Sequence, residues 1–478
     1  MLRRSLSAFA FIACYLLSAQ PAHAQETKDQ RTKPPAVEKW TKNLRSGLRY
    51  SFIVQRAPFP LMAHVLHLKF PQEGIRMESL VGGDTVLAAN GGPSRETVSS
   101  IAARTKAYAA INGDYFGTDG DILGFHIFDG ELVSEPFPTR AICVWNEREV
   151  RFDKPSWSAD LVSPTGQSHH IDGVNRALGG SEIIVVTPRG GKAVSKNPAY
   201  FFVFESSQSL RASGETPLLF KHVLTDQTEY PLKAGQLVVM ANERTAGPLL
   251  ENLQQNTEWK VISKLEGGAD YTNAKWAVAG GPTLLSSGRQ VVAVGAERFQ
   301  QDFVNSRHPR TGIGITPDGE ILFVVVDGRS SLSAGLSLSE FASLFRELGC
   351  TDAINLDGGG SSTLYVAGSV LNRPSDGTER RVGNALLLFL PELPSAITDF
   401  KVVTSSPTVA VGGNVTLVLT RADGTVVPNE SVLWICEGRN AWIDQAGLLR
   451  GIAPGKVSIR AVTESGESRL ELEVVKSN

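Results

Sequence analysis

Short apolar runs broken by glycine, proline, asparagine and aspartate recur along residues 48–390, and this pattern most constrains how the chain can fold. Residues 183–187, 236–241, 312–316 and 321–326 are examples. Runs of this length between turn residues are typical of β-strands. The chain also contains 46 glycines without a collagen-like repeat, which indicates many turns and close backbone approaches. The pattern predicts an α+β fold with a large, mixed and β-rich domain.

One helix is well defined among these strands. Apolar residues recur at helical spacing along residues 338–348, namely Leu338, Phe341, Leu344, Phe345 and Leu348. Ser337 and Glu340 have the spacing of a capping box, and Gly349 is suited to end the helix. The apolar run 321–326 precedes the helix and the run 353–356 follows it. This order predicts a βαβ unit with parallel strands.

The N-terminus has the parts of an export signal. Two arginines precede an apolar stretch at residues 6–19, and Ala22-His23-Ala24 is a small-x-small cleavage site. We expect residues 1–24 to be a signal peptide, with no integral membrane span after its cleavage. Residues 25–42 are polar and predict a flexible leader. The formal net charge of −2 gives no basic field that would indicate nucleic-acid binding.

A second domain is expected after the sequence Pro-Glu-Leu-Pro at residues 391–394, which is typical of a boundary. Beyond it, short apolar or alternating runs lie at residues 415–420, 431–436, 457–462 and 470–475. Such runs, separated by tight turns, predict a small β-sandwich. Residues 447–457 resemble the closing motif of bacterial Ig-like domains of group 2. We therefore expect a large domain at residues 43–393 and an Ig-like domain at residues 394–478.

Two aspartates follow the strands on either side of the predicted helix. Asp327 comes directly after the first strand, and Asp357 directly after the second. Parallel strands would place both carboxylates at one edge of the sheet, where open α/β sheets usually build their sites. Gly358, Gly359 and Gly360 come next, and successive N–H groups there can form an anion nest. We therefore expect one cleft that holds both aspartates and binds an anion.

A cationic cluster lies just before the strand at residues 311–316. It contains Arg307, His308 and Arg310, and arginine is suited to bidentate phosphate contacts. The hairpin that follows would bring Arg310 to the same sheet edge as Asp327. A solvated basic loop is the alternative interpretation.

Five motifs occur here in one order. They are Ile111-Asn112-Gly113-Asp114-Tyr115-Phe116, Arg307-His308-Pro309-Arg310-Thr311-Gly312-Ile313-Gly314, Asp327-Gly328-Arg329, Ala353-Ile354-Asn355-Leu356-Asp357-Gly358-Gly359-Gly360-Ser361-Ser362-Thr363 and Asn372-Arg373-Pro374-Ser375-Asp376-Gly377. As an ordered set over residues 90–390 they resemble the phosphodiester glycosidase family. The resemblance implies hydrolysis of a sugar-1-phosphodiester of the N-acetylglucosamine-1-phosphodiester type. Asp114 stands where a small residue or glycine often occurs in that family.

The residues and the resemblance together predict the site. Asp357 and Asp327 are the expected catalytic carboxylates. The expected substrate-binding residues are Asn112, Asp114, Arg307, His308, Arg310, Arg329, Asn355, Gly358, Gly359, Gly360, Ser361, Ser362, Asn372, Arg381 and Asn384. No cofactor and no metal ligand is predicted, although a divalent cation stays open.

Two other functions also stay open. The β-sandwich favours a polysaccharide- or cell-wall-binding protein without turnover. The two aspartates would alternatively serve as cation ligands in a metal-dependent phosphodiesterase. The expected partner is a glycan or sugar phosphodiester, and the Ig-like domain is a candidate contact for cell-envelope polysaccharide. The expected location is periplasmic or extracellular, with a role in exopolysaccharide or envelope glycan metabolism.

Overall fold

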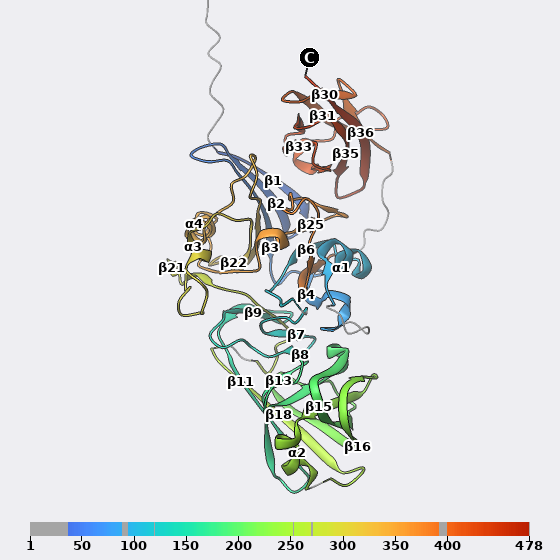
Figure 1. Ribbon diagram of the computed structural model, residues 1–478. Helices are drawn as coiled ribbons and strands as arrows, with labels where there is room; N and C mark the ends of the chain where they lie inside the picture. The colour runs from blue at the N-terminus through green and yellow to red at the C-terminus, as the bar shows by residue number, and fades with distance from the viewer. Residues whose placement is uncertain are drawn as a thin grey trace, which may run out of the picture. The chain divides into compact units, whose positions relative to one another are not determined.

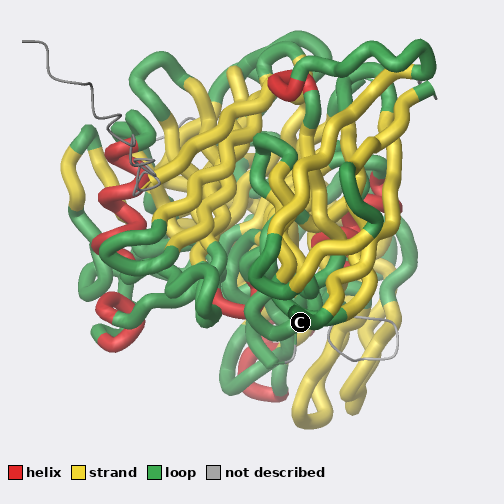
Figure 2. The backbone as a smooth tube through the Cα atoms, turned by 90° about the horizontal axis from the view of Figure 1, so that it is seen from above, coloured by secondary structure: helices red, strands yellow, loops and turns green. Residues whose placement is uncertain are grey.

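A computed structural model describes residues 37–87, 94–118, 120–251, 253–268, 271–391 and 399–477 (Figure 1). Strands make up far more of these residues than helices, as Figure 2 shows, so the β-rich prediction is confirmed. The predicted signal peptide and residues 25–36 lie outside the described residues. Residues 37–42 belong to the first strand instead of a flexible leader, because they pair with the second strand.

Two facing sheets form the centre of the large domain. The eight-stranded sheet has the order β1 (Val37–Arg45), β2 (Leu48–Gln55), β3 (Leu61–Lys69), β23 (Glu320–Val326), β22 (Arg310–Ile315), β24 (Asp352–Asn355), β20 (Thr283–Ser286) and β21 (Arg289–Gln290). The five-stranded sheet has the order β26 (Ser369–Val370), β25 (Leu364–Val366), β6 (Ala109–Asn112), β28 (Asn384–Phe389) and β4 (Arg76–Val81).

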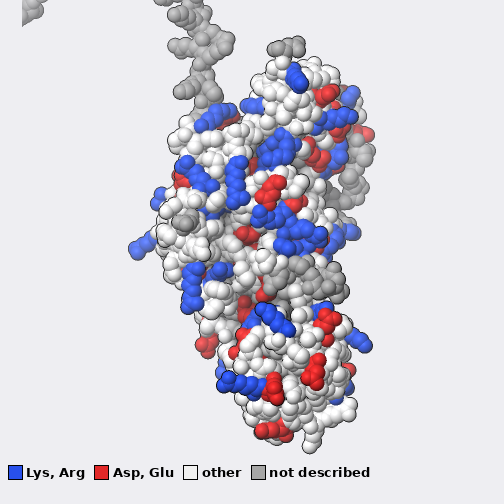
Figure 3. All heavy atoms as spheres, viewed as in Figure 1, with Lys and Arg blue, Asp and Glu red and all other residues white. Residues whose placement is uncertain are grey.

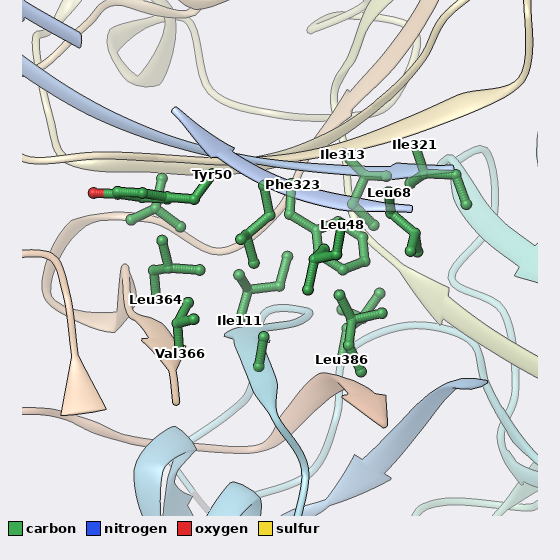
Figure 4. Packing of buried hydrophobic residues seen from close by; sticks show 14 of the residues in the cluster. Leu48, Tyr50, Leu68, Ile111, Ile313, Ile321, Phe323, Leu364, Val366 and Leu386 are labelled. Carbon is green, nitrogen blue, oxygen red and sulfur yellow. The ribbon is translucent and has the colours of Figure 1, made fainter. Parts of the chain in front are cut away.

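The main hydrophobic core lies between these two sheets (Figure 4). Tyr50, Ile313 and Phe323 of the eight-stranded sheet face Ile111 and Leu386 of the five-stranded one. Strand alternation explains this arrangement, since every second side chain points to the same face of a sheet. The intervening side chains of the eight-stranded sheet pack on its other face in a second core cluster.

Helices cover the outer faces of both sheets. α3 (Asp302–Asn305) and α4 (Leu338–Glu347) lie on the eight-stranded sheet, and α1 (Val98–Thr105) lies on the five-stranded one. The predicted capping box of α4 is present, with Ser337 and Glu340 bonding reciprocally. Glycine in β22 lets α4 approach closely: a Cβ added at Gly312 would lie 2.9 Å from Phe341 Cε1.

The βαβ unit is not confirmed as a pair of adjacent strands. β23 and β24 do run in the same direction, but β22 lies between them and pairs antiparallel with both. The hairpin from Arg310 to Val326 supplies this intervening strand. The carboxyl ends of β23 and β24 still share one sheet edge, but they are two strand spacings apart, about 10 Å.

Two further sheets and a short ribbon complete the large domain. One sheet has the order β10 (Val150–Asp153), β9 (Ile142–Trp145), β19 (Trp276–Ala279), β7 (His126–Phe128) and β8 (Glu131–Ser134). The other has the order β12 (Ser168–Ile171), β11 (Ser156–Val162), β18 (Glu258–Glu266), β16 (Gly214–Pro231), β15 (Lys192–Glu205), β17 (Gln236–Ala241), β14 (Ile183–Val186) and β13 (Gly173–Val174), with α2 (Glu243–Leu250) packed against it. β5 (Glu96–Thr97) pairs with β27 (Arg381–Val382).

The C-terminal part is an Ig-like sandwich of two four-stranded sheets, as expected. The first contains β29 (Phe400–Thr404), β31 (Asn414–Arg421), β34 (Leu448–Gly451) and β33 (Ala441–Ile443). The second contains β30 (Thr408–Ala410), β36 (Glu467–Val475), β35 (Gly455–Val462) and β32 (Leu433–Glu437). Leu433 and Ile435 also join the main core of the large domain, and Arg460 donates to the Ala367 carbonyl.

Surface charge is mixed. Figure 3 shows lysine and arginine interspersed with aspartate and glutamate over the face in view, in keeping with the net charge of −2. Among the residues that the structure describes, none of the helices has both the length and the apolar character needed to cross a membrane.

Phe341 tests how far the packing of α4 on the sheet stabilises the fold. Phe341→Ala should lower the free energy of unfolding by about 3–5 kcal/mol, because it leaves a cavity against β22. Urea unfolding measures this loss. The exposed Arg346→Ala on the same helix is the matched control and should change stability by less than about 0.5 kcal/mol. Equal effects of the two substitutions would contradict the packing described here.

Candidate active site

The segments after β6 and β24 meet and place two aspartates next to each other. The backbone N–H of Asp357 donates to the Gly113 carbonyl over 3.0 Å. The Asn112 side-chain amide donates to the Asp357 carbonyl over 2.7 Å. Its Oδ1 accepts from the Thr311 hydroxyl at 2.8 Å, which ties the end of β6 to β22. Asn112 therefore holds the main chain next to the two aspartates in place. Its amide is occupied by these bonds and does not face a ligand.

Asp114 and Asp357 are two nearby acids at this junction, Asp114 buried and Asp357 partly buried. Burial raises the pKa of Asp114 to about 7, and the charge of Asp357 adds to this, whereas the Tyr115 amide and Arg140 oppose it. Burial also raises the pKa of Asp357 to about 6, against the lowering effects of Ser361, the Gly358 amide and Arg380. Both carboxyl groups thus have pKa values raised toward neutral pH, which suits acid–base chemistry.

The surroundings of Asp114 leave hydrogen-bonding capacity unused. Within the described residues, neither of its carboxyl oxygens accepts a hydrogen bond of ordinary geometry, although the side chain is 1% exposed. Asn355 Oδ1 and two nitrogens of Arg140 are likewise buried and unpartnered there. Folded proteins leave few such atoms, and a group of them at one place indicates a ligand site.

The glycine loop differs from the predicted anion nest. The Gly358 N–H donates to Asp357 Oδ1 at 2.9 Å, and the Gly359 N–H donates to the Pro309 carbonyl at 2.9 Å. The N–H groups of Ser361 and Ser362 close a short turn on Gly358 and Gly359. These amides are therefore already occupied by protein acceptors.

The glycines instead allow two arginines to lie directly over the loop. A Cβ added at Gly359 would lie 3.1 Å from Arg329 Nη2, and one at Gly360 would collide with Arg380. Arg329 also contacts His308 Nδ1 at 3.2 Å, and Arg380 is held by Asp376 at 2.6 Å. Two guanidinium groups beside the buried acids supply the donors that an anion needs.

Several predicted residues hold the site rather than line it. Arg310 is completely buried and donates to the carbonyls of Leu336, Phe303 and Ser306, with burial lowering its pKa to about 10. Asn384 accepts from the Asp114 N–H at 2.8 Å. Asn372 accepts from the Leu364 N–H and donates to the Ser362 carbonyl.

Two predicted arginines point elsewhere. Arg307 is paired with Glu340 on α4 and lies over the Phe59 ring at 3.6 Å. Arg381 donates to the Arg95 carbonyl beside the ribbon of β5 and β27. Of the adjacent pair, it is therefore Arg380 rather than Arg381 that lies over the glycine loop.

Sequence reasoning missed three residues of the site. Tyr115 donates to the Gly281 carbonyl at 2.9 Å, and its pKa is raised well above the usual value, mainly by burial. Arg140 lies over the rings of Tyr115, Phe137 and Phe299 at 4.4–5.4 Å. Tyr115 and Arg380 lie inside or next to the recognised motifs, which could have found them. No sequence signal points to Arg140.

Asp327 has surroundings of its own. Its Oδ1 accepts from the Arg373 N–H at 2.8 Å, and its Oδ2 lies 3.6 Å from His64 Nε2. None of these partners contacts Asp357. Strand alternation places Asp327 on the core face of the sheet, the face of Val325. The expected single cleft with both aspartates therefore becomes two separate carboxylate environments.

Metal ligation was an open alternative for these aspartates. Over the described ranges, no group of three or more His, Cys, Asp or Glu side chains has an arrangement that could hold a metal ion. The separate surroundings of Asp327 and Asp357 do not favour a cation shared by both.

Comparison with known proteins agrees with the motif resemblance. Residues 219–389 match the phosphodiester glycosidase family, and residues 396–474 match the bacterial Ig-like domain of group 2. The glycosidase match covers β22, β23, α4 and the glycine loop. The resemblance and the Ig-like prediction are thus confirmed: one part of the chain is similar to phosphodiester glycosidases, and a C-terminal part is similar to bacterial Ig-like domains of group 2.

Particular relatives align over short stretches. The SPbeta prophage-derived protein YomE of Bacillus subtilis is 44% identical over 89 residues, which is 19% of this chain and 14% of that protein. The N-acetylglucosamine-1-phosphodiester alpha-N-acetylglucosaminidase of Bos taurus is 38% identical over 135 residues, 27% of this chain and 24% of that enzyme. The chain thus spans less than a quarter of either relative.

A solved structure shares the fold. A hypothetical protein from Synechocystis superposes with a TM-score of 0.61 at 22% identity, covering 75% of this chain and 64% of the other.

The raised pKa of Asp114 predicts a pH-dependent stability. Its folded pKa exceeds the unfolded value of about 3.9, so between pH ~4 and pH ~7 the native state binds more protons. Unfolding free energy from this group therefore falls as pH rises through that range. Asp114→Asn should remove this pH-dependent loss of stability. The difference in unfolding free energy, variant minus wild type, should therefore be larger at pH 8 than at pH 5.

Urea unfolding at the two pH values measures this difference, which should be on the order of 1–4 kcal/mol. The exposed Asp226→Asn serves as the control and should show no such pH dependence. An Asp114→Asn variant that loses the same stability at both pH values would contradict the buried protonated acid.

Proposed function

We propose that this chain is an exported hydrolase that releases a sugar from a sugar-1-phosphodiester. The observation that carries the proposal is the raised pKa of two nearby acids, Asp114 and Asp357, next to the glycine loop over which Arg329 and Arg380 lie. Carboxyl groups can act on the anomeric carbon or on the attacking water, and guanidinium groups can bind the phosphate.

The reaction breaks the bond between the anomeric carbon and the phosphate oxygen. A water molecule supplies OH to the carbon and a proton to the medium, while the phosphate leaves as a monoester with the bonding electron pair. Asp357 is proposed to act on the anomeric carbon or on the attacking water. Since a phosphate monoester is a weak base, it needs little protonation as it leaves. Asp114 is proposed to stay protonated up to about pH 7 and so to limit the negative charge near the phosphate.

The substrate class rests on the relatives. The Bos taurus relative is named for N-acetylglucosamine-1-phosphodiester. We extend that sugar class to this chain because residues 219–389 match the phosphodiester glycosidase family and 135 residues are 38% identical to that enzyme. Which sugar the protein releases is to be determined with a panel of sugar-1-phosphodiesters.

Export is proposed on two grounds. The sequence of residues 1–24 has the pattern of a signal peptide. The C-terminal domain matches the bacterial Ig-like domain of group 2. We propose exopolysaccharide or cell-envelope glycan as the physiological setting.

Asp357→Asn tests the catalytic assignment. With a panel of sugar-1-phosphodiesters, the wild type should release free sugar, and the variant should lose about 10²–10⁴-fold in kcat/KM. Release of reducing sugar and of phosphate monoester is measured, with and without a chelator. The exposed Asp226→Asn is the control and should keep full activity. Turnover of no phosphodiester in the panel, by a folded wild type, would sink the proposal.

The two arginines over the glycine loop test the phosphate assignment. Arg329→Ala and Arg380→Ala should each lower kcat/KM about 10- to 100-fold on a phosphodiester, because each removes a charge-assisted contact. The loss should be smaller on a neutral aryl glycoside of the same sugar. Lysine at either position should restore only part of the activity, since it lacks the planar fork.

Arg310→Ala provides the contrast. It should lower stability and slow both substrate types alike, because Arg310 holds three main-chain carbonyls. A phosphate-selective loss from Arg310→Ala, with none from Arg329→Ala or Arg380→Ala, would assign the phosphate contact to Arg310 instead.

A further inference from the structure

A cavity lies beside Asp327, and neither Asp114 nor Asp357 lines it. Its volume is about 430 Å³, within the range of small-molecule sites. Asp327, His64 and Tyr50 line it from the eight-stranded sheet, and Trp442 lines it from the Ig-like sandwich. Asp327 and His64 are only 2% and 4% exposed.

Two buried polar atoms in this cavity have hydrogen-bonding capacity left. His64 Nε2 and Asp327 Oδ2 lie 3.6 Å apart, too far for a hydrogen bond between them. Neither has another partner among the described residues. The other atoms of both groups are occupied, since His64 Nδ1 bonds the Tyr50 hydroxyl at 2.7 Å and Asp327 Oδ1 accepts from Arg373.

The pair is complementary to a hydroxyl group. Because the carboxylate faces Nε2, we assign the imidazole proton to that nitrogen, with Nδ1 accepting from Tyr50. One ligand hydroxyl can then donate to Asp327 Oδ2 and accept from His64 Nε2–H at the same time. An ammonium group would suit the carboxylate but would face the His64 N–H and the nearby Arg373 guanidinium. A neutral hydroxyl therefore fits better than a cation.

Aromatic rings form the apolar part of the same cavity. Phe52 stacks on the His64 ring at 4.9 Å, and Trp442 meets Phe52 edge-on at 6.3 Å. Trp442 is only partly buried and lines the cavity, with the Arg450 guanidinium 4.5 Å from the centre of its ring on one face. Aromatic surface next to hydroxyl-binding groups is the combination that accommodates a sugar ring, with its apolar faces and polar edge.

We propose that this cavity is a non-catalytic binding site for one neutral sugar residue of a glycan. The proposal rests on the proposed glycan-directed function, but it concerns a different set of side chains. It gives Asp327 a binding role where the sequence predicts a catalytic one. It also gives the Ig-like sandwich a part in holding the glycan through Trp442.

Calorimetric titration of the full mature chain with methyl glucoside and N-acetylglucosamine tests the proposal. At least one of these neutral sugars should bind the wild type. Asp327→Asn should weaken that binding at least tenfold, because the amide keeps an acceptor for Arg373 but places a donor toward the ligand. Trp442→Ala should do the same, with Trp442→Phe as a milder variant if the alanine variant does not fold. Thermal unfolding verifies that each variant is folded.

Arg329→Ala separates this site from the active site. It should leave neutral-sugar binding within about twofold, whereas it removes a phosphate contact. Sugar binding lost with Arg329→Ala but kept with Asp327→Asn would overturn the proposal. So would the absence of neutral-sugar binding to the folded wild type, which would mean that a water molecule bridges the two atoms. Turnover of phosphodiesters is a separate readout, so either result stands whether or not hydrolysis is observed.

Discussion

The side-chain amide of Asn112 is the interaction on which the candidate site depends. It joins the two central sheets by accepting from Thr311 of β22 and from the Thr363 N–H while donating to the Asp357 carbonyl. Asn112 is completely buried, so each of these bonds replaces one that water would otherwise make. Loss of this amide would leave several buried groups unpaired at once, and the positions of Asp114 and Asp357 would no longer be set against each other.

The parts of the fold that the sequence predicts correctly are those that depend on residues close together in the chain. The capping box of α4 and the apolar runs of β22 and β23 depend on neighbouring residues, and they are present as expected. The position of β22 between β23 and β24 is a choice of strand order that no local pattern records. The Ig-like sandwich was recognisable because its short strands and closing motif lie within one continuous segment.

The site was predictable at the level of segments but not of side-chain direction. The motifs at Asp114, Arg329 and Asp357 do come together, because the segments after β6, β23 and β24 meet where the two facing sheets end. Asp327 follows the same strand as Arg329, yet its carboxyl group lines a cavity that neither Asp114 nor Asp357 lines. Arg310 likewise turns toward main-chain carbonyls, and Arg380 replaces its neighbour Arg381. One-residue shifts of this kind reverse the face of a side chain, and the sequence pattern there is too short to decide it.

The charges at the site suit an anionic substrate only in one protonation state. Two ionised carboxylates near each other would repel a phosphodiester as well as each other. Since the pKa values of Asp114 and Asp357 are about 7 and about 6, one of the two groups keeps its proton between these pH values. Arg329 and Arg380 lie over the glycine loop, but Asp376 is bonded to Arg380, so the two guanidinium groups only balance Asp376 and one further acid charge. The resemblance places a small residue at position 114 in many family members. An aspartate there is compatible with a bound anion only if it stays protonated, which requires a raised pKa. Burial supplies that pKa.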